Sequence, residues 1–362
     1  KQLKFQISNL RIPVDQPEEN LKPVVAKKLK ISKDLIQSVE ISRRALDARG
    51  RGIPFYELVV LVELSSSLPE VPSNVRPWVP PVYEPLPTPS QALLNKHVTV
   101  LGAGPCGLFA ALTLARRGIK VTLIERGEMV KERAKSVSRL MGKREINRES
   151  NLCYGEGGAG TFSDGKLYSR IGAKATADVL RIMIDCGAPE DILINSRPHL
   201  GTDRLITLLK GMRKHLQDLG VELRYNTRVD QILPQKNGAE LLCRGGERIK
   251  TDLLILAPGH SSRSLYRHLH DIGVAMEAKP FSVGFRIEHP QALINHIQYG
   301  KYAQLDNIPA ADYRLAFNND DGNRPVRVFS FCMCPGGSVV PTTTKENEVC
   351  VNGMSHAARS GH

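Results

Sequence analysis

Residues 97–127 read HVTVLGAGPCGLFAALTLARRGIKVTLIERG and decide the fold. The apolar run over 97–101 predicts a buried strand, and a GxGxxG motif follows it directly. Small and aliphatic residues over 108–115 predict a helix, and a second apolar run over 121–124 predicts a strand that ends in Glu125. Strand, glycine turn, helix and acid-tipped strand in this order are typical of a dinucleotide-binding βαβ unit.

The three glycines of the motif have different expected tasks. Gly102 allows the tight turn, Gly104 lets the backbone approach a pyrophosphate, and Gly107 lets the helix pack close to the strand. The pyrophosphate then lies at the helix N-terminus, where free N–H groups favour negative charge. Glu125 lies 23 residues after Gly102, where its carboxylate can accept hydrogen bonds from both hydroxyls of an adenosine ribose.

The composition is that of an ordinary soluble globular chain. Its 362 residues, 41% hydrophobic and 24% charged, allow two or three domains. No apolar run approaches the roughly 20 residues that cross a bilayer, and the N-terminus lacks the apolar core of a signal peptide. Seven cysteines, an odd number in a large chain, favour reduced thiols. We therefore expect no membrane contact and a cytoplasmic location, or a plastid one if a targeting segment was removed.

The net charge of +13 raises the question of a nucleic-acid partner, because phosphate backbones bind clustered Lys and Arg. Residues 1–64 hold 12 basic and 8 acidic side chains, a net charge of +4, which leaves +9 over the other 298 positions. Charge spread in this way favours a solvated basic surface that also suits an anionic cofactor. Nucleic acid is therefore the less favoured partner.

Changes in composition divide the chain into four expected regions. Residues 65–96 contain eight prolines between Pro69 and Pro89, which predict an extended linker. The other regions are a small α+β module at 1–64, a Rossmann-like α/β domain with a parallel sheet flanked by helices at 97–273, and an inserted β-rich domain at 274–362.

Hydrophobic periodicity predicts the individual elements. The expected helices cover 18–29, 128–141, 175–186 and 203–219, the last with Thr202 as its N-cap. The expected strands, besides those of the βαβ unit, cover 3–10, 36–45, 55–64, 221–229, 253–256, 281–287 and 327–333. A glycine-rich loop is expected over 155–172.

Five further segments carry a family resemblance. They are SNLCYGEGGAGTFSDGKLYSR (150–170), PHLGTDRL (198–205), LAPGHSSR (256–263), KPFSVGFRIEHPQ (279–291) and FCMCPGGSVV (331–340). With the glycine turn, they resemble flavoproteins of the glutathione-reductase fold class, and more narrowly an uncharacterised family of FAD-dependent dehydrogenases. The resemblance implies an FAD-binding domain at 97–273 and a substrate domain at 274–362 that covers the flavin. Because only one GxGxxG is present, NAD(P)H either docks transiently as electron donor or is not the donor.

The resemblance also implies which residues contact FAD. It places the loop over 155–161 along the flavin ring and pyrophosphate. It also places the end of the run over 253–259, which closes in Ala257-Pro258-Gly259, beside the cofactor. Two interpretations of Arg133 stay open, contact with the pyrophosphate or ribose and a solvated position on its helix; His260 and Arg263 contact the cofactor or cap a helix. The expected cofactor-binding residues are Gly102, Gly104, Pro105, Cys106, Gly107, Glu125, Arg126, Arg133, Gly157, Gly158, Ala159, Gly160, Thr161, Asp164, Val229, Ala257, Gly259, His260 and Arg263.

Three residues are the candidates for catalysis: Lys166, Arg286 and His289. A lysine beside the pyrimidine edge of a flavin stabilises the negative charge that gathers there on reduction. Arg286 and His289, with Glu288, are suited to hold an anionic or carbonyl substrate, although a surface ion-pair group reads the same way. Cys332 and Cys334 are expected to be buried reduced thiols, with a redox role as the alternative, and no metal site is expected.

The function these residues favour is an FAD-dependent oxidoreductase that transfers hydride between flavin N5 and a small-molecule substrate. The first alternative is an RNA-binding flavoprotein of the tRNA-modifying type, with the basic module at 1–64 as its RNA reader. A second alternative is a flavin-binding scaffold without catalysis. Neither the substrate nor the oligomeric state is readable from the sequence.

Overall fold

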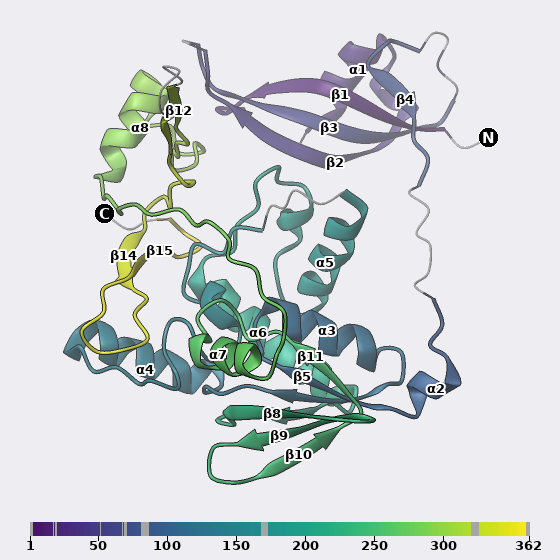
Figure 1. Ribbon diagram of the computed structural model, residues 1–362. Helices are drawn as coiled ribbons and strands as arrows, with labels where there is room; N and C mark the ends of the chain where they lie inside the picture. The colour runs from purple at the N-terminus through teal and green to yellow at the C-terminus, as the bar shows by residue number, and fades with distance from the viewer. Residues whose placement is uncertain are drawn as a thin grey trace.

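The computed structural model describes residues 3–16, 18, 20–50, 52–66, 68, 71–80, 87–167, 173–319 and 326–359. A small sheet module at the N-terminus stands beside a larger α/β body, and the C-terminal segments lie along one side of that body (Figure 1). Parts of the expected linker (81–86) and of the expected glycine-rich loop (168–172) lie outside the described residues.

The centre of the larger body is a parallel sheet, as the βαβ pattern predicts. Its strands are β5 (His97–Leu101), β6 (Lys120–Ile124), β7 (Glu222–Arg224) and β11 (Leu253–Leu256), in the order β11-β5-β6-β7. All three neighbouring pairs run parallel. The Rossmann-like fold class expected for this region is confirmed.

The two faces of this sheet bury different partners because side chains alternate along each strand. Val98 and Val100 of β5, with Leu123 of β6, pack against α3 (Pro105–Ala115) and α6 (Thr202–Asp218) in one core cluster. On the opposite face Leu101 and Ile124 pack against a second, antiparallel sheet and α7 (Arg263–Asp271). The sheet is thus buried on both sides, as parallel sheets require.

The antiparallel sheet consists of β8 (Val229–Gln235), β9 (Gly238–Cys243) and β10 (Arg248–Thr251), in the order β10-β9-β8. The single strand expected over 221–229 is wrong. Asn226 adopts a left-handed conformation with φ of 53°, which ends β7 and turns the chain toward β8.

Two further helices cover the body, α4 (Val130–Lys143) and α5 (Ala173–Asp185). Both match the expected helices within a few residues. Thr202 is not the N-cap of α6 but its first residue, because Gly201, with φ of 79°, occupies the cap position. The Thr202 hydroxyl instead donates to the carbonyls of Thr161 and Ser163, each at 3.1 Å.

The N-terminal module is a four-stranded antiparallel sheet with one helix, α1 (Lys22–Leu29). Its strands are β1 (Lys4–Pro13), β2 (Ile36–Asp47), β3 (Phe55–Leu64) and β4 (Val75–Pro77), in the order β2-β3-β1-β4. β4 and the short helix α2 (Gln91–Leu94) lie in the region expected to be a linker throughout. The described part of that region is therefore structured where β4 pairs with β1.

The C-terminal region holds two separate hairpins and a helix rather than one sheet. The hairpins are β12 (Ala316–Asn319) with β13 (Val326–Phe329), and β14 (Ser338–Pro341) with β15 (Val351–Met354); the helix is α8 (Gln291–Tyr299). Short 3-10 turns lie at Lys33–Leu35, Gly158–Gly160, Glu190–Leu193 and Gly300–Tyr302. The strand expected over 327–333 is present only as β13.

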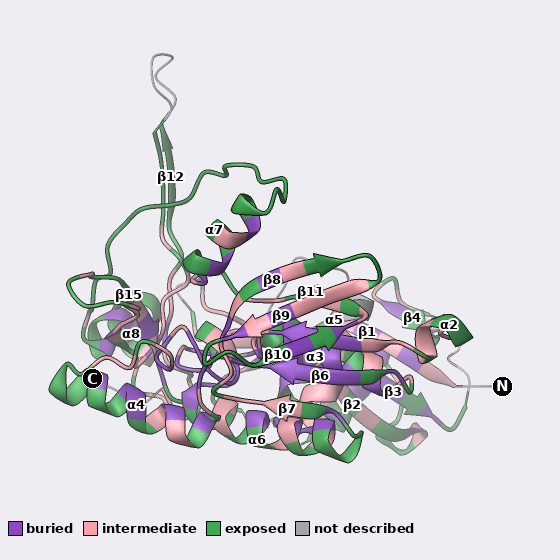
Figure 2. Ribbon diagram, turned by 60° about the horizontal axis from the view of Figure 1, so that its bottom comes forward, coloured by how far each residue is buried: buried purple, intermediate pink, exposed green. Residues whose placement is uncertain are grey.

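The strand expected over 281–287 is wrong. The segment is extended and makes no ladder in the described residues, and Phe281, Val283, Phe285 and Ile287 are all exposed. In Figure 2 this stretch is part of the exposed connection between α7 and α8. The alternation of apolar residues predicted a strand, but no neighbouring strand pairs with it in the described chain.

Candidate functional site

A cavity of about 430 Å³ opens where three strands of the parallel sheet end. Leu101, Ile124 and Leu256, the last residues of β5, β6 and β11, all line it. The carboxyl ends of parallel strands are where α/β sheets bind their ligands. The cavity contains 13 of the residues expected to contact a dinucleotide: Gly102, Gly104, Pro105, Cys106, Glu125, Arg126, Gly158, Ala159, Gly160, Val229, Ala257, Gly259 and His260.

The glycine turn has the geometry that the motif predicts. Gly102 has φ of 109°, and a Cβ there would lie 2.2 Å from the carbonyl oxygen of Ala257. A Cβ on Gly107 would lie 1.8 Å from the carbonyl oxygen of Gly102, so α3 crosses β5 in close contact. Helix α3 begins with no side-chain cap, and its first residues border the cavity. Its free N–H groups are therefore available to an anion.

Glu125 is held rigidly at the other side of the turn. Its side chain is 7% exposed and accepts backbone hydrogen bonds from Ala103 at 2.9 Å, Gly127 at 2.9 Å and Gly155 at 3.0 Å. A carboxylate has about four acceptor positions, so one position is left for a group in the cavity. The contact of Glu125 with the ribose hydroxyls stays a prediction.

Arg133 neither borders the cavity nor lies in solvent, so both interpretations from the sequence are wrong. Its side chain is fully buried, and burial lowers the pKa of the guanidinium to about 10, so it stays charged near neutral pH. The guanidinium donates to the Thr161 hydroxyl at 3.1 Å. Its other acceptors are the carbonyls of Asn151, Leu152, Gly155, Glu156 and Gly158. Arg133 therefore shapes the glycine-rich loop from behind and is not part of the cavity wall.

The glycine-rich loop presents only its turn to the cavity. Gly158, Ala159 and Gly160 line it, whereas Gly157 donates its N–H to the carbonyl of Ala103 at 2.8 Å. Thr161 is buried, and its hydroxyl bonds back to the carbonyl of Glu156 at 3.2 Å. Gly107, Gly157 and Thr161 thus support the cavity without lining it.

Asp164 and Lys166 follow the loop and form an ion pair, 2.9 Å from carboxylate to ammonium. Asp164 is 2% exposed, and it accepts a hydrogen bond from Ser355. Burial alone raises the pKa of Asp164, but the Ser355 hydrogen bond and the charge of Lys166 outweigh it, so the pKa is lowered. Asp164 was expected to contact the cofactor; the structure uses it to fasten the C-terminal region to the loop.

Lys166 also donates to the thiol of Cys334 at 3.4 Å. Burial lowers the pKa of Lys166, but the Asp164 carboxylate outweighs that effect, so its pKa is raised. A Cβ on Gly353 would lie 3.0 Å from Cys334 Sγ and 3.3 Å from the Arg286 guanidinium, so both groups border one point. Lys166, Cys334 and Arg286 therefore form one group, which we name the lysine–thiol cluster.

The third candidate, His289, makes a different contact. Its Nε2 lies 2.9 Å from the hydroxyl of Tyr313. Neighbouring Glu288 accepts the backbone N–H of Val339 at 2.6 Å. The sequence grouped these residues with Arg286, but only Arg286 borders the lysine–thiol cluster.

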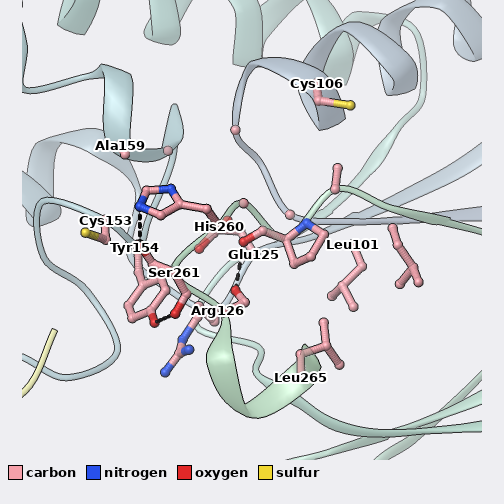
Figure 3. Close-up of a pocket in the computed structure, with 18 of the residues that line it drawn as sticks. Leu101, Cys106, Glu125, Arg126, Cys153, Tyr154, Ala159, His260, Ser261 and Leu265 are labelled. Atoms are coloured by element: carbon pink, nitrogen blue, oxygen red, sulfur yellow. Dashed lines mark hydrogen bonds between the residues drawn. The ribbon is translucent and has the colours of Figure 1, made fainter. Parts of the chain in front are cut away.

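The segment after β11 supplies one wall of the cavity. His260 projects into it toward the turn that carries Ala159, and its Nε2 lies 3.3 Å from the Ser261 hydroxyl (Figure 3). Arg263 begins α7 and pairs with Glu348 at 3.3 Å. Its predicted cofactor contact is not supported by this placement, because Arg263 does not line the cavity.

Sequence reasoning missed the wall beyond Glu125. The guanidinium of Arg126 stacks 3.9 Å over the ring of Tyr154. Glu149 accepts hydrogen bonds from Arg126 at 2.6 Å and from Arg228 at 2.9 Å. Their positions in the sequence could have predicted this wall, because Tyr154 directly precedes the glycine-rich loop and Arg228 directly precedes Val229. Other lining residues absent from the prediction are Cys153, Thr227, Pro258, Ser261, Ser262, Ser264, Leu265 and Tyr266.

Three family models match this chain. A model described as an FAD binding domain matches residues 95–139, which contain the glycine turn and Glu125. A model described as an FAD-dependent protein, C-terminal domain-like, matches 280–362, and a domain of unknown function matches 4–63. An uncharacterised protein of Clostridium beijerinckii is 38% identical over 359 residues, which is 98% of this chain and 67% of that protein. The chain belongs to the same family as this protein, a family of FAD-dependent proteins.

Three more distant matches each cover less than half of this chain. A D-amino acid dehydrogenase of Helicobacter pylori is 26% identical over 129 residues, 35% of this chain and 30% of that protein. Among solved structures, the flavoprotein disulfide reductase RclA of Escherichia coli is 16% identical, covers 45% of this chain and 21% of its own, and has a TM-score of 0.23. Thioredoxin reductase of Lactococcus lactis is 18% identical, with coverages of 46% and 36% and a TM-score of 0.26.

FAD is the cofactor of this family, and the cavity fits it. The uncapped start of α3 suits the pyrophosphate, and the remaining acceptor position of Glu125 suits the ribose. The RNA-binding alternative gains no support, because no matched family model is described as RNA-binding and the one over residues 4–63 is described as a domain of unknown function. Among the described residues, no helix has the length and apolar character needed to cross a membrane.

Glu125→Gln is expected to raise the Kd for FAD by about tenfold or more, because an amide NH₂ would face a backbone N–H donor in either orientation. Titration of apoprotein with FAD, followed by flavin fluorescence, measures the change. Glu132→Gln, on α4 and outside the cavity wall, is the matched control. Equal Kd values for the two variants would show that Glu125 does not hold the cofactor.

Proposed function

We propose that the protein is an FAD-dependent dehydrogenase that transfers hydride between flavin N5 and a small anionic or carbonyl substrate. The observation that carries the proposal is the position of the lysine–thiol cluster. The loop that lines the cavity with Gly158–Gly160 continues directly into Asp164 and Lys166. FAD, when bound, supplies the hydride-accepting ring.

The cluster suits an anionic substrate because its charges are mostly positive. Lys166 stays an ammonium beside Asp164, and the Arg286 guanidinium borders the same point. Two cations against one buried carboxylate leave positive charge to bind a substrate carboxylate. The D-amino acid dehydrogenase relative supports the same class of substrate. Arg286 and Lys166 would orient the substrate, and His289 is proposed only to support the segment that carries Arg286.

The test is anaerobic reduction of the bound flavin, followed by its visible absorbance. D-alanine, D-lactate, NADH and NADPH are the probes, because they separate acid substrates from a nicotinamide donor. We expect at least one acid to bleach the flavin. If the protein binds FAD and none of the four probes reduces it, the dehydrogenase proposal fails and the scaffold alternative is favoured. If only NADH or NADPH reduces it, the substrate is an acceptor rather than an acid donor.

Lys166→Met is expected to slow flavin reduction by about 100-fold, as loss of one charged stabilising group does in other enzymes. FAD should still bind, because Lys166 does not line the cavity, and the Kd for FAD is measured beside the rate because the variant also removes the ion pair of the buried Asp164. Stopped-flow absorbance measures the rate, with Lys135→Met, on the exposed side of α4, as the control. A variant that reduces its flavin at the normal rate would remove Lys166 from the proposed mechanism.

A further inference from the structure

The N-terminal module is attached to the cofactor-binding body through β2. The backbone N–H of Arg44 donates to the carbonyl of Ile194 at 2.7 Å, and the N–H of Ser196 donates to the carbonyl of Arg44 at 2.9 Å. This is a two-way backbone pairing between an edge strand of one sheet and residues 194–196 of the larger body. Backbone hydrogen bonds therefore join the N-terminal module to the larger body at this point.

The side chain of Arg44 reinforces this pairing. Its Nε and Nη2 both donate to the Asn195 side-chain oxygen, at 3.0 and 2.8 Å, and its Nη1 donates to Glu18 at 2.8 Å. The guanidinium also lies 5.5 Å from the centre of the Tyr56 ring. Neighbouring Arg43 is exposed and makes one long contact, 3.4 Å to the Ser196 hydroxyl. Arg44 therefore holds the side-chain oxygen of Asn195, whose amide nitrogen donates to the Asp191 carboxylate at 3.2 Å within the larger body.

Residues 194–202, which we name the connecting segment, pair at their other end with the cofactor loop. Leu167 donates its N–H to Pro198, Leu200 to Gly165, and Gly201 to Asp164, at 2.9 to 3.0 Å. The Thr202 hydroxyl donates to two carbonyls of the same loop, as described above. The connecting segment thus joins Arg44 at one end to the residues around Lys166 at the other.

We propose that the N-terminal module positions the cofactor loop through the connecting segment, and that Arg44 is the positioning residue. The module is then a part of the cofactor site rather than a separate binding unit. Loss of the Arg44 side chain removes both donors to the Asn195 side-chain oxygen and leaves this end of the connecting segment held from the module by backbone pairing alone. The loop that presents Gly158–Gly160 to FAD then loses support. The inference rests on FAD binding and not on the proposed hydride transfer.

The test compares Arg44→Ala with Arg43→Ala in the full chain. We expect the Kd for FAD to rise about tenfold in Arg44→Ala, from loss of its hydrogen bonds, and to stay unchanged in Arg43→Ala. Hydrogen exchange should speed up in 157–167 and 194–202 of Arg44→Ala and not in β1 or β3. Neither readout requires turnover, so a failure of the dehydrogenase proposal does not affect them.

Asn195→Ala gives an independent check, because it removes the same contact from the other side. It should reproduce the loss of FAD affinity, and the double variant should lose less than the sum of the two single losses, since both variants remove the Arg44–Asn195 contact. Two results would overturn the inference. One is an FAD affinity in Arg44→Ala equal to that in Arg43→Ala; the other is faster exchange spread evenly over the whole chain, which indicates general destabilisation.

Discussion

Gly107→Ala is expected to leave the protein without FAD. A Cβ at this position would lie 1.8 Å from the carbonyl oxygen of Gly102, far inside contact distance. Both groups are backbone-fixed, so α3 must move away from β5 to relieve the overlap. Overpacking of this kind costs about 1–3 kcal/mol in stability, and more where no side chain can yield. The move also displaces the helix start that borders the cavity.

The expected readout is at least a 100-fold higher Kd for FAD, which corresponds to about 2.8 kcal/mol, together with a lower Tm. Gly142→Ala is the matched control, because a Cβ there meets no atom within 4 Å in the exposed last turn of α4. Normal FAD binding by Gly107→Ala would show that the close crossing of α3 and β5 is not needed for the site.

Arg133→Met is expected to lower stability by about 4 kcal/mol or more. The substitution keeps much of the buried volume but removes the donor of five backbone carbonyls, of which those of Asn151 and Leu152 have no other donor among the described residues. Each buried unsatisfied group costs about 1–3 kcal/mol. The loop over 151–161 is held by these bonds, so FAD affinity should fall as well. Urea denaturation of apoprotein measures the stability loss separately from cofactor binding.

Arg139→Met is the control for Arg133, since it is the same change on the same helix. Arg139 is exposed and makes one hydrogen bond, 3.3 Å to Ser136. Its replacement should change stability by less than about 0.5 kcal/mol. If the two variants proved equally stable, the buried guanidinium would not organise the loop.

The burial of Arg133 could be predicted from the sequence, but its hydrogen-bond partners could not. On α4 the buried residues Val130, Arg133, Val137 and Leu140 are spaced by three or four, so Arg133 shares the apolar side of its helix. That spacing was readable, and it favours a buried arginine over a solvated one. Its acceptors were not readable, because backbone carbonyls leave no trace in side-chain composition.

The βαβ unit was predictable because its contacts are local in sequence. The lysine–thiol cluster was not, since Lys166 and Cys334 are 168 residues apart and no pattern relates them. The segment over 281–287 shows the opposite limit. Its alternating apolar residues have high strand propensity. A strand also needs a neighbouring strand to pair with, and propensity does not show whether one is present.

The order of the parallel strands has a consequence for how this site can diversify. From β5 the chain passes to β6 on one side across α3, and it reaches β11 on the other side only after crossing the opposite face through β8, β9 and β10. The connection from β5 to β6 and the connection that leads to β11 lie on opposite sides of the carboxyl end of β5. An opening therefore exists at this end of the strand, whatever residues the loops carry. Connectivity thus fixes where a molecule is held, while loop residues are free to change which molecule it is.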